Sequence, residues 1–146
     1  IGKGVSCYIS SKNVSITNEK KIEELFLKVG KIFKFKTEKE IDMATAVSGS
    51  GPGYVFTLIN SLEKASNKIG FSKKISRELV LSTLLGSIDL MKKTKKEPSV
   101  LANSIAIKGG TTEAGIKILK KYKLNKIMHE TILAAYKKAT TLGKDD

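Results

Sequence analysis

The spacing of apolar residues changes once along the chain, at Thr37, and this change constrains the fold more than any other feature. Before it, two short stretches alternate weakly between apolar and polar residues and flank a segment with helical spacing. After it, apolar residues recur every three or four positions almost to the C-terminus, with short breaks at glycine and proline. The sequence therefore predicts a mainly α-helical protein that begins with a small strand–helix–strand unit.

The first 36 residues predict a single α/β unit. One or two short strands are expected within residues 1–16, and another at residues 32–35. Between them, a helix is expected to begin at Thr17-Asn18 and to stop at Gly30. One such unit is too small to be a domain, so it is expected to be the end of a larger parallel-sheet domain. Because the chain begins at Ile1 and not at Met, we expect it to be cut from a longer protein.

Residues 37–146 predict an all-helical domain. Thr37 and Glu40 match a capping box, in which each residue satisfies the backbone of the other at a helix start. The 73–93 stretch is apolar on more than one face, which favours a central helix or one at an interface. The expected helices lie at residues 38–44, 52–69, 73–93 and 98–105. Thr111-Thr112-Glu113 is expected to cap a further helix that runs through Tyr122, and Asn125 to cap the last one, which runs to Leu142.

Composition excludes several classes of protein. Cys7 is the only cysteine and His129 the only histidine, so no disulfide framework, no metal site and no Ser-His-Asp triad are expected. No segment approaches the roughly 18–20 uninterrupted apolar residues of a membrane span, and no membrane association is expected. A lone cysteine fits a reducing compartment, and a cytoplasmic location is expected.

The charge is strongly positive, at +13, and Arg77 is the only arginine among 27 basic residues. Such an excess can attract nucleic-acid phosphates, but specific readers of nucleic acid favour the bidentate fork of arginine. A biased genome could also raise the lysine and isoleucine content. A solvated lysine-rich surface is therefore preferred over nucleic-acid binding. The alternative of a basic helical module, which binds nucleic acid or only oligomerises and has no catalytic activity, stays open at this point.

Two glycine-rich segments, Ser48–Tyr54 and Lys108–Thr112, each open a predicted helix. Free N–H groups at a helix start suit an anion, and glycine lets a ligand approach the backbone. The hydroxyls of Ser50, Thr111 and Thr112 could give such an anion further, directional hydrogen bonds. The alternative is a tight turn whose hydroxyls cap the helix. The first segment is not a dinucleotide fingerprint, because it follows no strand and lacks the last glycine of G-x-G-x-x-G.

Taken together, these segments resemble the pyrroline-5-carboxylate reductase family. Asp42–Phe56 is similar to the family's D-x-x-T-A-x-S-G-S-G-P-A-Y stretch, and Gly109–Thr112 to the end of its S-P-G-G-T-T loop. Ser82–Gly86 and Pro98–Leu101 fall between them in the family's order. The resemblance covers roughly residues 37–142, and the part before it looks like the end of the family's dinucleotide-binding domain.

The resemblance implies a two-domain enzyme. Residues 1–36 would be the remnant of a Rossmann-type domain, and residues 37–146 the helical dimerisation and substrate-binding domain. The implied reaction is the NAD(P)H-dependent reduction of 1-pyrroline-5-carboxylate to L-proline. NADP or NAD would be bound mainly by a domain outside this chain, so the chain alone is expected to be inactive. Relatives form homodimers or larger rings of dimers through interlocking long helices.

The resemblance also implies the site residues. Thr112 is expected to be catalytic, with its hydroxyl on the ring nitrogen of the substrate. Ser104 is expected to touch the cofactor. The expected substrate-binding residues are Glu38, Ser50, Gly51, Gly110, Thr111 and Thr112. For Glu38 the alternative is an acid that only favours the dipole of its helix.

The chain departs from the family pattern at the second glycine segment. Ile107-Lys108 stands where the family usually has Ser-Pro, which loosens the loop and removes a polar group. Lys108 could attract a carboxylate or a pyrophosphate, or could point into solvent. Gly53 replaces the usual alanine and weakens the start of its helix by up to about 1 kcal/mol.

Overall fold

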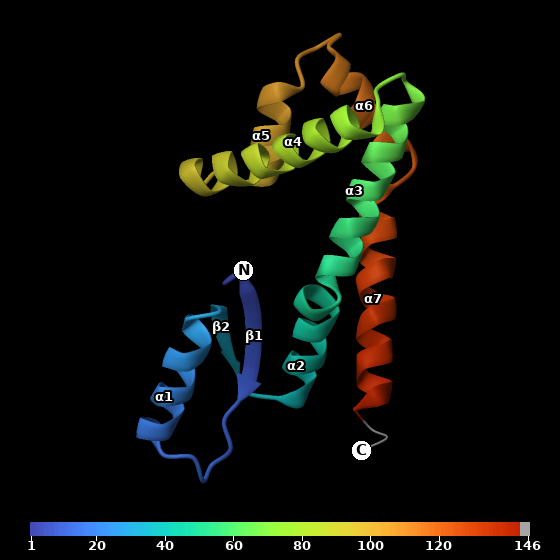
Figure 1. Ribbon diagram of the computed structural model, residues 1–146. Coiled ribbons are helices and arrows are strands. Elements are labelled where there is room, and N and C mark those ends of the chain that lie inside the picture. Colours follow the sequence, from blue (N-terminus) through green and yellow to red (C-terminus); the bar gives the residue numbers. More distant parts are fainter. Residues whose placement is uncertain (144–146) are drawn as a thin grey trace. The chain divides into compact units, whose positions relative to one another are not determined.

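The computed structural model describes residues 1–143 and confirms a mainly helical chain with a small β-α-β unit at its start (Figure 1). It divides into two compact units: residues 1–52 together with the chain from 129 onward, and residues 53–128. The elements in chain order are β1 (Gly4–Ile9), α1 (Ile16–Leu27), β2 (Gly30–Phe35), α2 (Glu38–Ala44), the π-helix η1 (Thr45–Gly49), α3 (Gly51–Lys68), α4 (Lys73–Thr94), α5 (Pro98–Ile105), α6 (Thr111–Lys121) and α7 (Leu124–Leu142).

In the first unit, β1 and β2 pair in parallel, with Gly4 opposite Gly30 and Ile9 opposite Phe35. A parallel pair needs a crossover connection, and α1 supplies it beside the two strands (Figure 1). Gly30 is required at its position, because a Cβ there would lie 2.0 Å from the carbonyl oxygen of Gly4. The strand pairing thus depends on a close approach of the two backbones.

A polar network holds α1 to the strands. The Tyr8 hydroxyl on β1 donates hydrogen bonds to Glu19 and Glu23 on α1, and Lys34 on β2 forms an ion pair with Glu19. The hydrogen bond to Glu23 raises the pKa of Tyr8, and the hydrogen bond from Lys34 lowers the pKa of Glu19. The network therefore favours a neutral phenol beside two carboxylates, one of which the ammonium group neutralises.

The predicted ends of α1 were wrong by about two residues. The helix begins at Ile16 because Ser15, in extended conformation, accepts a hydrogen bond from the Asn18 N–H at 3.3 Å and acts as the N-cap. It ends at Leu27, and Gly30 begins β2 instead of ending the helix. Serine and the following threonine and asparagine are all good N-caps, so the sequence pattern alone did not separate them.

The capping box at α2 is confirmed, because Glu40 accepts from the Thr37 N–H and the Thr37 hydroxyl oxygen accepts from the Glu40 N–H. Hydrogen bonds, first from the Lys36 N–H and then from Thr37, lower the pKa of Glu40. The break expected between the helices at residues 38–44 and 52–69 is absent. The chain continues through η1, and the Ser50 N–H donates to the Thr45 carbonyl at 2.8 Å.

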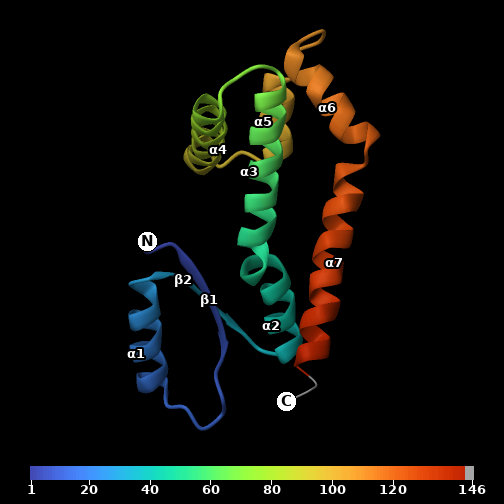
Figure 2. The ribbon, with the colours of Figure 1, turned by 45° about the vertical axis from the view of Figure 1, so that its right-hand side comes forward.

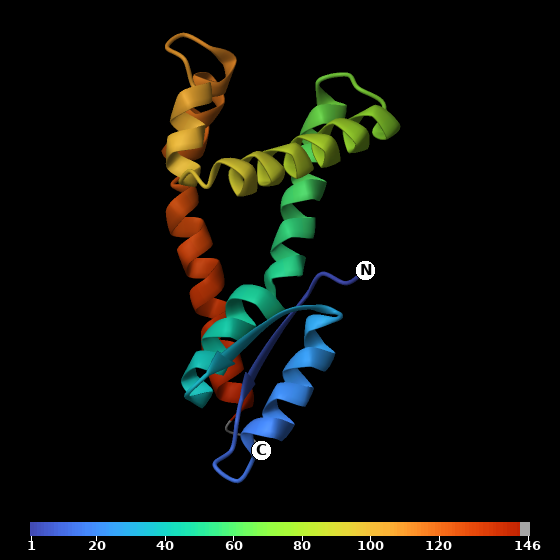
Figure 3. The same ribbon diagram turned by 90° about the vertical axis from the view of Figure 1, so that its left-hand side faces the viewer.

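In the second unit, α4 crosses the end of α3 at a steep angle (Figures 1 and 3). The turn between them uses Gly70 at φ 115°, and Ser72 caps α4 by accepting from the Ile75 N–H. Ser76 is fully buried, and its hydroxyl donates to Asn67 Oδ1 at 2.8 Å. This buried hydrogen bond joins the two helices at their junction. Pro98 begins α5, as predicted.

A single copy of the chain buries almost no apolar side chain. Among the described residues, Ala46 is the only apolar side chain in the buried class, at 1% exposure. Within the second unit, α3, α4, α5 and α6 make few contacts with one another (Figure 2). The two-faced apolar pattern predicted for residues 73–93 therefore appears as exposed leucine, isoleucine and methionine along α4.

Replacing Ser76 tests the buried link between α3 and α4. We expect Ser76→Ala to lower the free energy of unfolding by about 1–2 kcal/mol, because Asn67 Oδ1 loses its donor in a partly buried place. Urea denaturation at a fixed protein concentration measures this. The matched control is Ser87→Ala, whose exposed hydroxyl donates to Thr83 on the same helix, with a change within about 0.5 kcal/mol. Equal losses of stability in the two variants would contradict the inference that the buried hydrogen bond between Ser76 and Asn67 joins α3 to α4.

Candidate functional site

The candidate site is the corner between α5 and α6. After α5 the Ile107 N–H donates to the Ile105 carbonyl at 3.0 Å, and the Gly110 N–H donates to the Ile107 carbonyl at 3.0 Å. Gly109 sits at φ 76°, a conformation that favours glycine. These bonds turn the chain within a few residues and place Gly110 as the N-cap of α6. Local sequence thus builds the corner, without help from other elements.

The first turn of α6 has open backbone donors. Within residues 1–143, no acceptor pairs with the N–H groups of Thr111, Thr112 or Glu113. The N–H of Gly110 is occupied by Ile107, and that of Gly109 donates to Glu113 Oε2 at 2.9 Å. The donors available to a ligand therefore lie one residue further along the chain than the glycine pattern suggested. Three N–H groups and the positive end of the helix dipole point the same way.

The two threonine hydroxyls are not used to cap the helix. The N-cap residue is Gly110, which has no capping side chain, and Thr111 and Thr112 are the first two residues of α6. The expected cap at the threonines is therefore wrong, and with it the alternative of a turn closed by its own hydroxyls. Thr112 is half-buried and Thr111 exposed, and neither hydroxyl has a protein partner among the described residues. Both stay available to a ligand.

The charges around the corner also favour an anion. The nearest acid in the helix, Glu113, is held by Lys117 at 3.2 Å and by the Gly109 N–H. Lys108 is exposed beside the glycines. A negatively charged group at the α6 start thus meets a helix dipole, a nearby ammonium group and an already paired carboxylate.

The other predicted site residues lie on different elements. Ser104 is exposed on α5, in the same unit as the corner, and its hydroxyl donates to the Leu101 carbonyl at 2.8 Å. Glu38 is the exposed first residue of α2. Ser50 and Gly51 are partly buried where η1 meets α3. The structure brings Gly110, Thr111 and Thr112 together in one corner, whereas Glu38, Ser50 and Gly51 belong to the other unit.

Glu113 is a site residue that the sequence analysis missed. Its side chain closes the loop onto Gly109, and its N–H is one of the three open donors. A signal was present, because an acid three residues after an N-cap often reaches back to the preceding backbone. The prediction placed the cap at the threonines and so gave this acid no role.

In the part of the chain that the structure describes, no three His, Cys, Asp or Glu side chains gather in an arrangement that could hold a metal ion. Among the helices of residues 1–143, none combines the length and the apolar character needed to cross a membrane.

The structure combines a two-stranded parallel sheet with a series of helices, one of which begins with open backbone donors. A family model described as pyrroline-5-carboxylate reductase dimerisation matches residues 38–142. The chain belongs to the pyrroline-5-carboxylate reductase family. This membership favours the enzyme interpretation over a basic module without catalytic activity.

Individual relatives agree with the family model. The chain is 33% identical over 144 residues to pyrroline-5-carboxylate reductase of Synechocystis, covering 99% of this chain and 54% of the relative. The Aquifex aeolicus reductase is 34% identical, with 97% and 53% covered. A crystal structure of the Plasmodium falciparum reductase with NADP bound matches with a TM-score of 0.92 and 37% identity, covering 97% of this chain and 54% of that one. The chain thus spans about half the length of these relatives.

Replacing Gly109 tests the geometry of the corner. We expect Gly109→Ala to lower the free energy of unfolding by about 1–2 kcal/mol, because alanine is strained at φ 76°. Gly115→Ala within α6, where a Cβ meets open space, is the matched control and should stabilise by about 0.5–1 kcal/mol. Urea denaturation distinguishes the two, and a neutral Gly109→Ala would show that the turn does not depend on this conformation.

Proposed function

We propose that this chain is the substrate-binding and dimerising part of an enzyme that reduces 1-pyrroline-5-carboxylate to L-proline. The observation that carries the proposal is the start of α6, with three open N–H groups and two unused threonine hydroxyls. The substrate is a small ring with one carboxylate and one imine nitrogen. A carboxylate suits the open N–H groups of Thr111, Thr112 and Glu113. The partly buried Thr112 hydroxyl is the proposed partner of the ring nitrogen.

The reaction adds a hydride to the carbon of the C=N bond and leaves a proton on the nitrogen. NADPH or NADH, when bound, supplies the hydride. Residues of this chain would hold the ring by its carboxylate, present one face of the imine, and support the nitrogen through the Thr112 hydroxyl. Glu38, Ser50 and Gly51 are the further proposed substrate contacts. Gly110 is proposed to border the substrate without a hydrogen bond, because its N–H donates to Ile107 and its carbonyl accepts from the Ala114 N–H.

The cofactor would be bound mainly by residues outside this chain. Ser104 is the proposed contact from this side, since its hydroxyl oxygen is exposed and still able to accept a hydrogen bond while it donates to Leu101. We assign residues 1–36 to the end of the dinucleotide-binding domain, and residues 37–146 to the helical domain. The Plasmodium falciparum relative with NADP bound supports the choice of cofactor. The free thiol of Cys7 supports a reducing, cytoplasmic compartment.

Replacing Thr112 tests the catalytic assignment. In the intact gene product that carries this chain, we expect Thr112→Val to lower kcat/KM for 1-pyrroline-5-carboxylate about 10²–10⁴-fold, the usual cost of losing a positioned proton-handling group. The absorbance of the reduced nicotinamide measures turnover. Thr94→Val is the control and should keep parental activity. It removes an exposed hydroxyl at the end of α4, which donates to the Leu90 carbonyl and accepts from the Lys96 N–H. Full activity of Thr112→Val, or no activity in the parent, would overturn the proposal.

The proposed enzyme is at least a homodimer. In a single copy, apolar side chains lie exposed on several faces of α4, with Leu79 at 47%, Leu85 at 60% and Ile88 at 44% exposure. Obligate dimers bury roughly 2,000–5,000 Å² or more in total, half of it on each copy. A second copy that covers α4 would remove this apolar surface from water.

Charge placed on α4 tests the dimer. We expect the parent chain to sediment as a dimer or larger, and Leu85→Glu to raise the dimer dissociation constant at least about tenfold, because a buried carboxylate would lack a partner. Lys93→Glu introduces the same residue on the same helix at a polar position and should assemble like the parent. A parent chain that sediments as a monodisperse monomer would contradict the proposal directly.

A further inference from the structure

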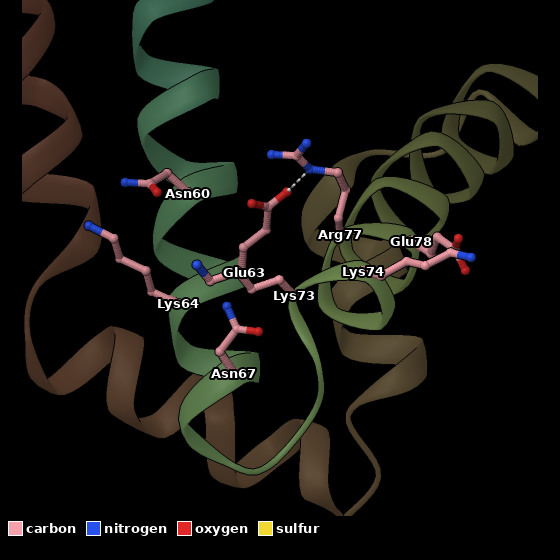
Figure 4. Close-up of a pocket in the computed structure, with 8 residues that line it drawn as sticks. All are labelled: Asn60, Glu63, Lys64, Asn67, Lys73, Lys74, Arg77 and Glu78. Carbon is pink, nitrogen blue, oxygen red and sulfur yellow. Dashed lines mark hydrogen bonds and ion pairs between the residues drawn. The ribbon is translucent and has the colours of Figure 1, made fainter.

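A second, unassigned cavity lies in the second unit, between the C-terminal half of α3 and the first turns of α4 (Figure 4). Its volume is about 540 Å³, which is within the usual range for pockets that hold small molecules. It is separate from the α5–α6 corner in sequence and shares no residue with it. Four cationic and two acidic side chains line it, together with two asparagines.

Half of the positive charge in the lining of this cavity is not balanced by an acid of the lining. Glu63 is already paired with Arg77 at 3.1 Å. Within the described part of the chain, Lys64, Lys73 and Lys74 have no carboxylate within ion-pair distance. Because Glu78 is the only other acid in the lining, a net positive charge remains. The cavity therefore favours an occupant with more than one negative charge.

Two of these lysines lie where a positive charge destabilises the helix when no anion is bound. Lys73 and Lys74 are the first two residues of α4, and the first turn of this 22-residue helix contains no acid. Cations at this end oppose the helix dipole, and they also repel Lys64 and Arg77 nearby. An anion between them would relieve both effects. The arrangement weakens the isolated helix and strengthens anion binding.

A buried contact orients a neutral donor in the same cavity. The Ser76 hydroxyl donates to Asn67 Oδ1 at 2.8 Å, and Ser76 is fully buried. Since the oxygen of the Asn67 amide is occupied, its NH₂ group is left to face the cavity beside Lys73 (Figure 4). The lining thus offers a fixed hydrogen-bond donor beside the flexible ammonium group of Lys73, which suits a tetrahedral oxyanion.

We propose that this cavity binds a phosphoryl group, with Lys64, Lys73 and the Asn67 amide as its donors. Two negative charges on the ligand offset the net charge of the lining. The volume exceeds that of a bare phosphate ion, so the site has room for a small organic carrier attached to the phosphoryl group. This proposal does not depend on the reductase activity, because none of these residues belongs to the proposed catalytic corner.

Isothermal titration of the whole chain with inorganic phosphate tests the site, at constant ionic strength. We expect saturable binding to the parent chain, and a dissociation constant at least about tenfold higher in the double variant Lys64→Gln/Lys73→Gln. The control double variant, Lys92→Gln/Lys93→Gln at the far end of α4, removes the same charge and should stay within about twofold of the parent. Circular dichroism confirms that each variant is folded.

The two sources of the phosphoryl group are separated by repeating the titration with glycerol 3-phosphate. Tighter binding than inorganic phosphate indicates a phosphorylated metabolite, and equal binding indicates free phosphate. The proposal is overturned if the parent shows no saturable binding, if both double variants lose affinity equally, or if binding persists in Lys64→Gln/Lys73→Gln. The last result would place the anion elsewhere.

Discussion

The structure depends on apolar helix faces that one copy of the chain leaves in water. The helical part has long amphipathic elements but almost no buried apolar side chain, and α4 exposes apolar residues on more than one face. Burial of such surface is the main favourable term in folding, so these helices are stable only when another surface covers them. Assembly and folding are therefore expected to be one process, and the family's dimerisation domain fits this requirement.

The α5–α6 corner, in contrast, is determined by local backbone chemistry. A glycine at positive φ, a carbonyl that accepts from Gly110, and an acid that reaches back to Gly109 leave the next three N–H groups free. A site built in this way needs little surrounding core. The corner can therefore keep its geometry even in a single copy of the chain, where the apolar helix faces are exposed.

The two proposed anion sites of the second unit, the α6 start and the cavity between α3 and α4, differ in the type of donor that they offer. The α6 start uses backbone donors and a helix dipole, which discriminate by position and suit a carboxylate in a fixed orientation. The cavity between α3 and α4 uses lysine ammonium groups, which are flexible point charges and suit the higher charge of a phosphoryl group. Three of the many lysines of the chain, Lys64, Lys73 and Lys74, gather in this cavity.

The sequence by itself determined the helix content, the capping box at Thr37, the start of α5 at Pro98 and the family, because caps, periodicity and motif spacing are local properties. Only the tertiary structure decided that the chain continues from α2 into α3 through the π-helix η1, and that the apolar faces of α4 stay exposed in a single copy. The cap of α6 by Gly110 and its open N–H groups are local, but they became visible only in the folded backbone. The physical reason is that each carbonyl and hydroxyl has several possible partners along the sequence, and only the folded backbone selects one of them.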